Sequence, residues 1–172
     1  ETVLNSNFFI SGIRVTAKQI NPITGLQELS QTKGSFISAS PKQSLEFDAV
    51  SASKFPHARM TSGACTLPNY SSTRGNSQRS SYIANFQHVI GAVIVEIVDD
   101  KIYHFRQVQA DADGLFCDLG VEYSPNKARK LTGDEAPVLV MGDYHAGEHD
   151  EPTVAAWTEV INQLGIQEVV FH

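Results

Sequence analysis

Two side chains that commonly bind metal ions, Asp143 and His145, stand two residues apart in the sequence GDYHAG at 142–147. Residues i and i+2 of an extended strand end point to the same side, so this carboxylate and imidazole are expected to converge. Both groups are ligands for divalent transition metals. Gly142 and Gly147 let the backbone turn sharply beside them. The spacing predicts half of a metal site, whereas the simpler alternative is a helix-capping Asp143 and a hydrogen-bonded His145.

The elements that must position this pair are a strand before it and a helix after it. The apolar run at 138–141 predicts a strand buried on both faces, as in a parallel sheet. Pro152 suits the first turn of a helix and Gly165 its end. Apolar residues between them recur at helical spacing, and residues 167–171 predict a second buried strand. Such a βαβ unit places ligands at the carboxyl ends of its strands.

The motif at 142–147 in this frame resembles the opening motif of the calcineurin-like metallophosphoesterases. The resemblance implies that Asp143 and His145 bind one ion of a two-metal site that holds manganese, iron, zinc or magnesium, with His145 also counted as catalytic. It covers residues 136–172 and the first of the family's motifs alone. The family's bridging aspartate would follow residue 172, which predicts that the chain is a fragment of a longer protein.

A looser resemblance extends over the earlier part of the chain. The runs KQSLEF, HARMTSGACTLPNY, HVIGAVIVEI and KIYHFRQ look like the amino-terminal region of phage proteins that carry a phosphoesterase core. These are the DNA-transfer proteins of siphophages, and the resemblance implies a DNA substrate and a location in the host cytoplasm.

Charge is distributed unevenly along the 172 residues. Residues 1–98 contain eight Lys and Arg against five Asp and Glu, whereas residues 99–172 contain five against fourteen. The 47 residues between Asp48 and Glu96 contain no acidic side chain. An acid-free stretch attracts anions, so we expect nucleic acid as a partner, with phosphate contacts from Lys54, Arg59, Arg74 and Arg79. A loop rich in Ser, Thr and Asn that merely lacks acids is an equal alternative.

The first part of the chain predicts mainly strands. We expect a strand at 8–17, a turn at 21–25, and strand-like segments between 34 and 50 that Pro41 interrupts. Residues 51–90 lack a regular pattern, with a surface loop at 70–81. Residues 89–98 and 101–110 predict a hairpin around a two-residue Asp99-Asp100 turn, followed by a strand at 115–123 and a polar connection at 124–135.

Other reactive side chains carry weaker predictions. His57 and His88 are candidate ligands that more often turn out to be structural, and His104 with Arg106 predicts a partly exposed face of the hairpin. Cys65 and Cys117 are expected to be reduced thiols, and a catalytic Cys65 with His88 or His104 is a minor alternative. Glu148 and His149 follow the metal motif and are either ligand-orienting groups or exposed side chains.

Together these patterns predict an α/β chain, α+β overall. A β-rich region at 1–130 precedes the first βαβ unit of a metallophosphoesterase-like sheet at 131–172. The expected function is a metal-dependent phosphoesterase of the DNA nuclease type, cytoplasmic and without a membrane span, with weak or no activity for residues 1–172 alone. The alternative is a non-enzymatic nucleic-acid-binding or assembly module.

Overall fold

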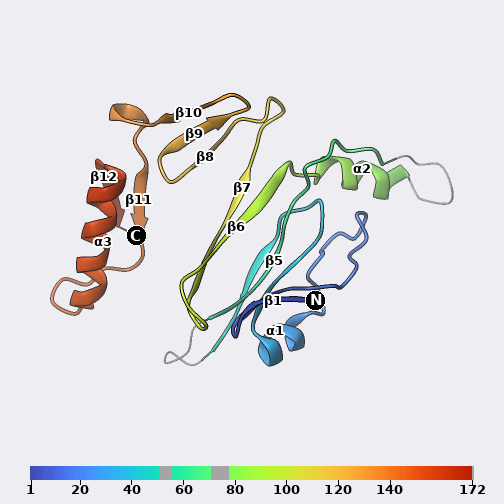
Figure 1. The fold of residues 1–172 in the computed structure, drawn as a ribbon, viewed down its shortest axis with the longest axis horizontal. Coiled ribbons are helices and arrows are strands. Elements are labelled where there is room, and N and C mark those ends of the chain that lie inside the picture. Colours follow the sequence, from blue (N-terminus) through green and yellow to red (C-terminus); the bar gives the residue numbers. More distant parts are fainter. Residues whose placement is uncertain (51–55, 71–77, 172) are drawn as a thin grey trace. The chain divides into compact units, whose positions relative to one another are not determined.

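Short strands dominate the chain and form four separate sheets, joined by three α-helices, within residues 1–50, 56–70 and 78–171 that the computed structural model describes. The chain divides into two compact units, unit 1 at Glu1–Ala112 and unit 2 at Asp113–His172 (Figure 1). This arrangement confirms a mixed, sheet-rich α+β chain. The division falls earlier than residue 130, so the small sheet after Ala112 belongs with unit 2.

Unit 1 is built on a five-stranded sheet in the order β1-β2-β3-β5-β4. Its strands are β1 (Thr2–Asn5), β2 (Phe8–Ile10), β3 (Ser35–Ser38), β4 (Leu45–Asp48) and β5 (His57–Thr61). The two inner pairings, β2 with β3 and β3 with β5, are parallel, and the two outer ones are antiparallel. Helix α1 (Gln27–Lys33) makes the connection between β2 and β3.

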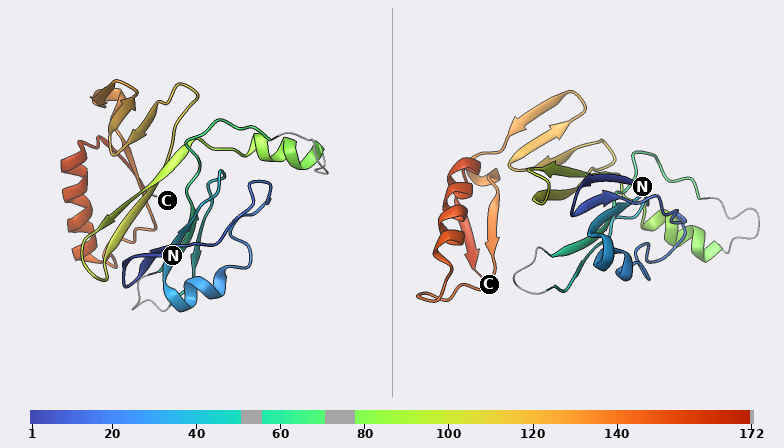
Figure 2. Two further views of the ribbon diagram at one scale, coloured as in Figure 1. Left: turned by 45° about the vertical axis from the view of Figure 1, so that its right-hand side comes forward. Right: turned by 60° about the horizontal axis from the view of Figure 1, so that its bottom comes forward.

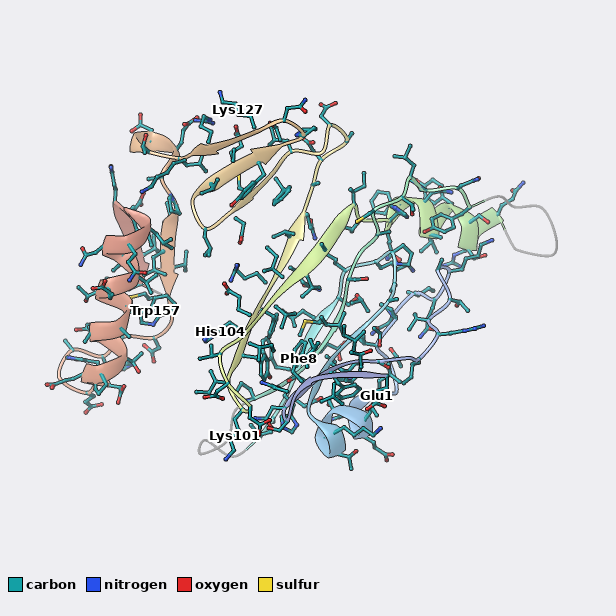
Figure 3. The ribbon with its side chains drawn as sticks, viewed as in Figure 1. Glu1, Phe8, Lys101, His104, Lys127 and Trp157 are labelled. Carbon is teal, nitrogen blue, oxygen red and sulfur yellow. The ribbon has the colours of Figure 1, made fainter. Side chains whose placement is uncertain are left out.

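A hairpin covers one face of this sheet. Strands β6 (Gly91–Ile97) and β7 (Tyr103–Gln109) pair antiparallel, as the sequence predicts. Tyr103 packs with Phe8, Ala58 and Met60 in a fully buried core, and Phe8 lies among the side chains between hairpin and sheet (Figure 3). The alternation of β7 therefore turns Tyr103 inward and leaves His104 exposed, as expected for a half-buried strand.

The hairpin tip is wider than the predicted two-residue turn. The last paired residues are Ile97 and Tyr103, so residues 98–102 form the loop. The Asp99 carboxylate accepts hydrogen bonds from the backbone N–H groups of Ile102 and Lys101, each at 2.7 Å. These bonds hold the pKa of Asp99 below its usual value and stabilise the wider loop.

Several elements of unit 1 differ from the sequence prediction. The strand expected at 8–17 ends at Ile10, and β1, α1 and β5 form where no element was predicted. The turn at 21–25 is present, and the Asn21 side chain accepts a hydrogen bond from the N–H of Ile23. Residues 78–81 of the expected surface loop belong to helix α2 (Gln78–Phe86), and residues 71–77 of that loop lie outside the described residues.

Unit 2 begins with a three-stranded antiparallel sheet of β8 (Phe116–Asp118), β9 (Val121–Ser124) and β10 (Lys127–Lys130). The single strand expected at 115–123 is wrong, because Leu119 and Gly120 both have positive φ, 46° and 76°, and reverse the chain there. The polar connection expected next contains β10 and a 3-10 helix, η1 (Gly133–Glu135). A two-stranded parallel sheet with one helix completes the unit.

Candidate metal centre

The candidate site lies at the carboxyl end of a parallel strand pair. Strand β11 (Val138–Met141) pairs in register with β12 (Glu168–Phe171), from Val138 opposite Glu168 to Met141 opposite Phe171. Helix α3 (Glu151–Leu164) connects them and runs along one face of the pair in every view (Figure 2). The predicted strand, turn, helix and strand are therefore present at the predicted places.

Local sequence signals explain where α3 begins and ends. The Asp150 carboxylate accepts a hydrogen bond from the backbone N–H of Thr153 at 3.0 Å, and Pro152 stands in the first turn, where its missing N–H costs nothing. Gly165 adopts a left-handed conformation with φ 68° and closes the helix on Ile161. The Thr153 side chain and its backbone N–H both lower the pKa of Asp150.

Only one face of the parallel pair is covered by α3. Met141, Val169 and Phe171 line an apolar hollow together with Trp157 and Ile161 of the helix. On the opposite face Val138 and Val140 are 51% and 67% exposed, so the prediction of a strand buried on both faces is wrong for the described residues. The helix supplies one layer, and the alternation of β11 points these two valines away from it.

Asp143 and His145 converge as their spacing predicts. Nε2 of His145 lies 2.9 Å from Oδ2 of Asp143, and both side chains are mostly exposed. The imidazole and the carboxylate thus present nitrogen and oxygen to the same point just beyond Met141. The two groups share a hydrogen bond, and bonds from the same two atoms to a metal ion would replace it.

An open hollow of about 440 Å³ is lined by this pair, by the rest of the β11–α3 loop and by the first turns of α3. The ring of Tyr144 stacks on His149, with centroids 5.1 Å apart, and also touches Phe171. Glu148 and Asp150 add carboxylates to the lining, so the hollow is acidic. Nδ1 of His149 is buried and finds no hydrogen-bond partner in the described part of the chain.

The donor set fits part of a metal site. Asp143 and His145 offer the oxygen and nitrogen that a divalent transition metal accepts. Within residues 1–50, 56–70 and 78–171, no group of three or more His, Cys, Asp or Glu side chains is arranged to hold one metal ion. The pair therefore fits a half-site, whose remaining ligands would be water, substrate or further protein groups.

The residues predicted to contact phosphate differ in their exposure and lie in different parts of the chain. Arg79 is exposed on α2. Arg59 is 7% exposed, and its guanidinium binds both oxygens of Asp48 at 3.0 Å, so its charge is neutralised inside unit 1. Lys54 and Arg74 lie outside the described residues. The four side chains are therefore not shown as one cluster.

The other candidate histidines and cysteines lie in separate surroundings. Both ring nitrogens of His88 are engaged, one by the Tyr70 hydroxyl at 2.8 Å and one by the Thr66 carbonyl. Cys65 and Cys117 are exposed free thiols. His57 stands at the start of β5, opposite Asp48 of β4. His88 therefore has a structural role that leaves it no free nitrogen for Cys65.

Sequence reasoning missed one feature that bears on function. Helix α2 exposes the aromatic rings of Tyr82 and Phe86, which are 71% and 80% accessible. The signal was present as Arg79, Tyr82, Ile83 and Phe86 at helical spacing. Arg79 lies in the loop expected at 70–81, and the other three lie in the stretch at 51–90 for which no regular element was predicted.

Comparisons with known proteins add no relative: no protein-family model, no curated protein and no solved structure matches the chain. Within the described residues, no helix is both long and apolar enough to cross a membrane.

Proposed function

We propose that the chain carries the first metal-binding motif of a metal-dependent phosphoesterase of the nuclease type. The observation that supports this proposal is the Asp143–His145 pair, whose Oδ2 and Nε2 atoms converge 2.9 Å apart at the carboxyl end of a parallel strand. Open α/β sheets bind their ligands at this end of their strands. A carboxylate and an imidazole are also the ligand types that manganese, iron and zinc accept, and the carboxylate alone suits magnesium.

In this proposal Asp143 and His145 hold the metal, and the neighbouring hollow receives the phosphoester. A divalent ion at such a site polarises the phosphoryl oxygen and lowers the pKa of a bound water. His149 lines the same hollow and adds a second imidazole to the site in this proposal. The stacked Tyr144 ring fixes the orientation of that imidazole.

The test is a calorimetric titration of Mn²⁺ into the wild-type chain and into Asp143→Ala and His145→Ala. We expect binding by the wild type and its loss in both variants. Asp134→Ala is the matched control, because Asp134 is an exposed acid in η1 of the same unit and lies outside the hollow. Absence of Mn²⁺ binding in the wild type, or equal binding in Asp143→Ala, would contradict the proposal.

The number of protein groups that can bind the metal ion determines how much hydrolysis we expect. Because two protein donors make half a site, we expect weak or no hydrolysis of bis(p-nitrophenyl) phosphate by this chain even when Mn²⁺ binds. Turnover that persists in Asp143→Ala would assign hydrolysis to a different site.

A non-enzymatic nucleic-acid-binding module is the second candidate function. The exposed aromatic face of α2 favours it, since large exposed apolar side chains on one helix face mark an interaction surface. Nucleic-acid binding by α2 does not by itself exclude a metal site, because the metal pair belongs to unit 2 and α2 belongs to unit 1.

A further inference from the structure

Helix α2 buries the face that carries small side chains and exposes the face that carries large ones, the reverse of the usual arrangement. It buries two small residues, Ser81 and Ala84, and exposes two large aromatic ones, Tyr82 and Phe86. Burying the rings instead would remove far more apolar surface from water. A helix that leaves this stabilisation unused presents a surface suited to a partner.

The two exposed rings form a regular platform. Tyr82 and Phe86 stand four residues apart, so they are neighbours on the helix surface. Their ring centroids are 6.5 Å apart and their planes differ by 12°, which makes them nearly parallel. Parallel rings with accessible faces suit stacking with flat aromatic groups, and nucleobases are the flat groups of a polymer.

Positive charge accompanies the platform. Arg79 is exposed one turn before Tyr82, and the Lys18 ammonium is held beside the helix by a 3.0 Å hydrogen bond to the Ser81 hydroxyl. Arg79 and Lys18 together line a hollow of about 320 Å³ with Ile20, Ser80 and Ile83. The sequence has no acidic residue between Asp48 and Glu96, so no carboxylate from this stretch opposes a polyanion.

We infer that this α2 face, formed by Arg79, Tyr82 and Phe86, binds single-stranded nucleic acid. Bases stack on the two rings, while Arg79 neutralises an adjacent phosphate and Lys18 adds positive charge in the hollow that Arg79 also lines. A duplex fits less well, because its bases are already stacked on one another and offer no free face. The inference rests on the nucleic-acid partner of the proposed function and specifies it as single-stranded. It does not use the metal pair, so the metal site and the nucleic-acid face can each fail without the other.

The test is a titration of residues 1–172 into a fluorescently labelled oligothymidine of fifteen nucleotides, followed by fluorescence anisotropy. EDTA in the buffer removes any contribution from metal ions. We expect wild-type binding that weakens about tenfold or more in the double variant Tyr82→Ala/Phe86→Ala. Tyr82→Phe/Phe86→Tyr keeps both rings and should restore binding. Phe47→Ala is the matched control, since Phe47 is 58% exposed on β4 of the same unit.

A charge variant tests the phosphate contact separately. Arg79→Gln should weaken binding and reduce the slope of log affinity against log salt by about one. Lys101→Gln should change neither quantity, because Lys101 lies at the hairpin tip, at the opposite end of unit 1 from α2 (Figures 1 and 3).

Two outcomes would overturn the inference. One is an oligonucleotide anisotropy that does not change when the wild-type chain is added, or that changes equally when Tyr82→Ala/Phe86→Ala is added. The other is concentration-dependent self-association in analytical ultracentrifugation that the same double variant abolishes, which would assign the face to a second copy of the chain. Both substituted side chains are exposed, and circular dichroism checks that the variants fold.

Discussion

The hydroxyl groups of Ser35 and Tyr103 lie 2.5 Å apart in the buried core of unit 1 and tie the β6–β7 hairpin to the five-stranded sheet. The Ser35 hydroxyl also accepts a hydrogen bond from the backbone N–H of Ala58 on the neighbouring strand β5. One serine thus joins β3, β5 and β7. Burial raises the pKa of Tyr103, and the hydrogen bond with Ser35 opposes that rise in part.

This pKa direction predicts an alkaline loss of stability. Tyr103 ionises in the unfolded chain at pH values where the folded chain keeps it neutral, so the free energy of unfolding falls as pH rises through its unfolded pKa of about 10 toward the higher folded value. In Tyr103→Phe we expect a loss of about 1 kcal/mol at pH 7 and a shallower decline above pH 9. Urea unfolding followed by circular dichroism at pH 7, 9 and 10.5 measures both.

Tyr82→Phe is the control for this prediction, because the Tyr82 ring is exposed in the same unit. Its pH dependence should match that of the wild type. An equally steep alkaline decline in Tyr103→Phe and in the wild type would show that another group governs it.

A second prediction concerns the buried ion pair on the other face of the sheet. Arg59 binds Asp48 with two hydrogen bonds of 3.0 Å and donates a third to the Ile23 carbonyl, and Ser30 also donates to Asp48. Arg59 also pairs with the more exposed Glu46 at 2.9 Å, whereas Asp48 is almost fully buried, so removing Arg59 leaves the Asp48 carboxylate buried without its cationic partner. We therefore expect Arg59→Met to destabilise unit 1 by about 3–5 kcal/mol in urea unfolding.

The matched control is the pair of Arg106 with Glu96, joined at 2.6 Å across the hairpin, in which Arg106 is partly exposed and Glu96 is exposed. Arg106→Met should cost at most about 1 kcal/mol, because solvent screens an exposed pair. Similar costs for the two variants would mean that Arg59 and Asp48 are not buried together in solution.

Arg59 also shows why part of unit 1 could not be predicted from sequence. Strand β5 reads HARMT, and its central arginine breaks the apolar pattern, because the partner Asp48 lies on β4 and the pairing is tertiary. Helix α2 was missed for a related reason, since it buries small residues and exposes large ones. In both elements a tertiary contact or a surface role overrides the local hydrophobic pattern.

Unit 2 was more predictable where its signals are local. A continuous apolar run, Pro152 in the first helical turn and Gly165 at the end specify β11 and α3 within a few residues. The approach of Asp143 to His145 follows from their spacing alone. His149, which lines the same hollow, could not be placed from sequence, because the packing of Tyr144 against it depends on the loop conformation.

The cap of α3 ties this candidate site to the stability of unit 2. Asp150 accepts hydrogen bonds from the Thr153 hydroxyl and from its backbone N–H, and both bonds lower the pKa of the carboxylate. Trp157 is the single tryptophan of the chain and lies on α3, beside the β11–β12 pair (Figure 3). Its fluorescence therefore follows the unfolding of unit 2.

The last prediction uses this probe to follow the cap as a function of pH. Because the folded pKa of Asp150 is depressed, its stabilising contribution is present above the unfolded value of about 4 and is lost as pH falls through the folded value. Asp150→Ser keeps a neutral cap. We expect Asp150→Ser to be less stable than the wild type at pH 7 and to approach it at pH 2.5, in urea unfolding followed by Trp157 fluorescence. A stability difference that stays constant over this range would contradict the charged cap.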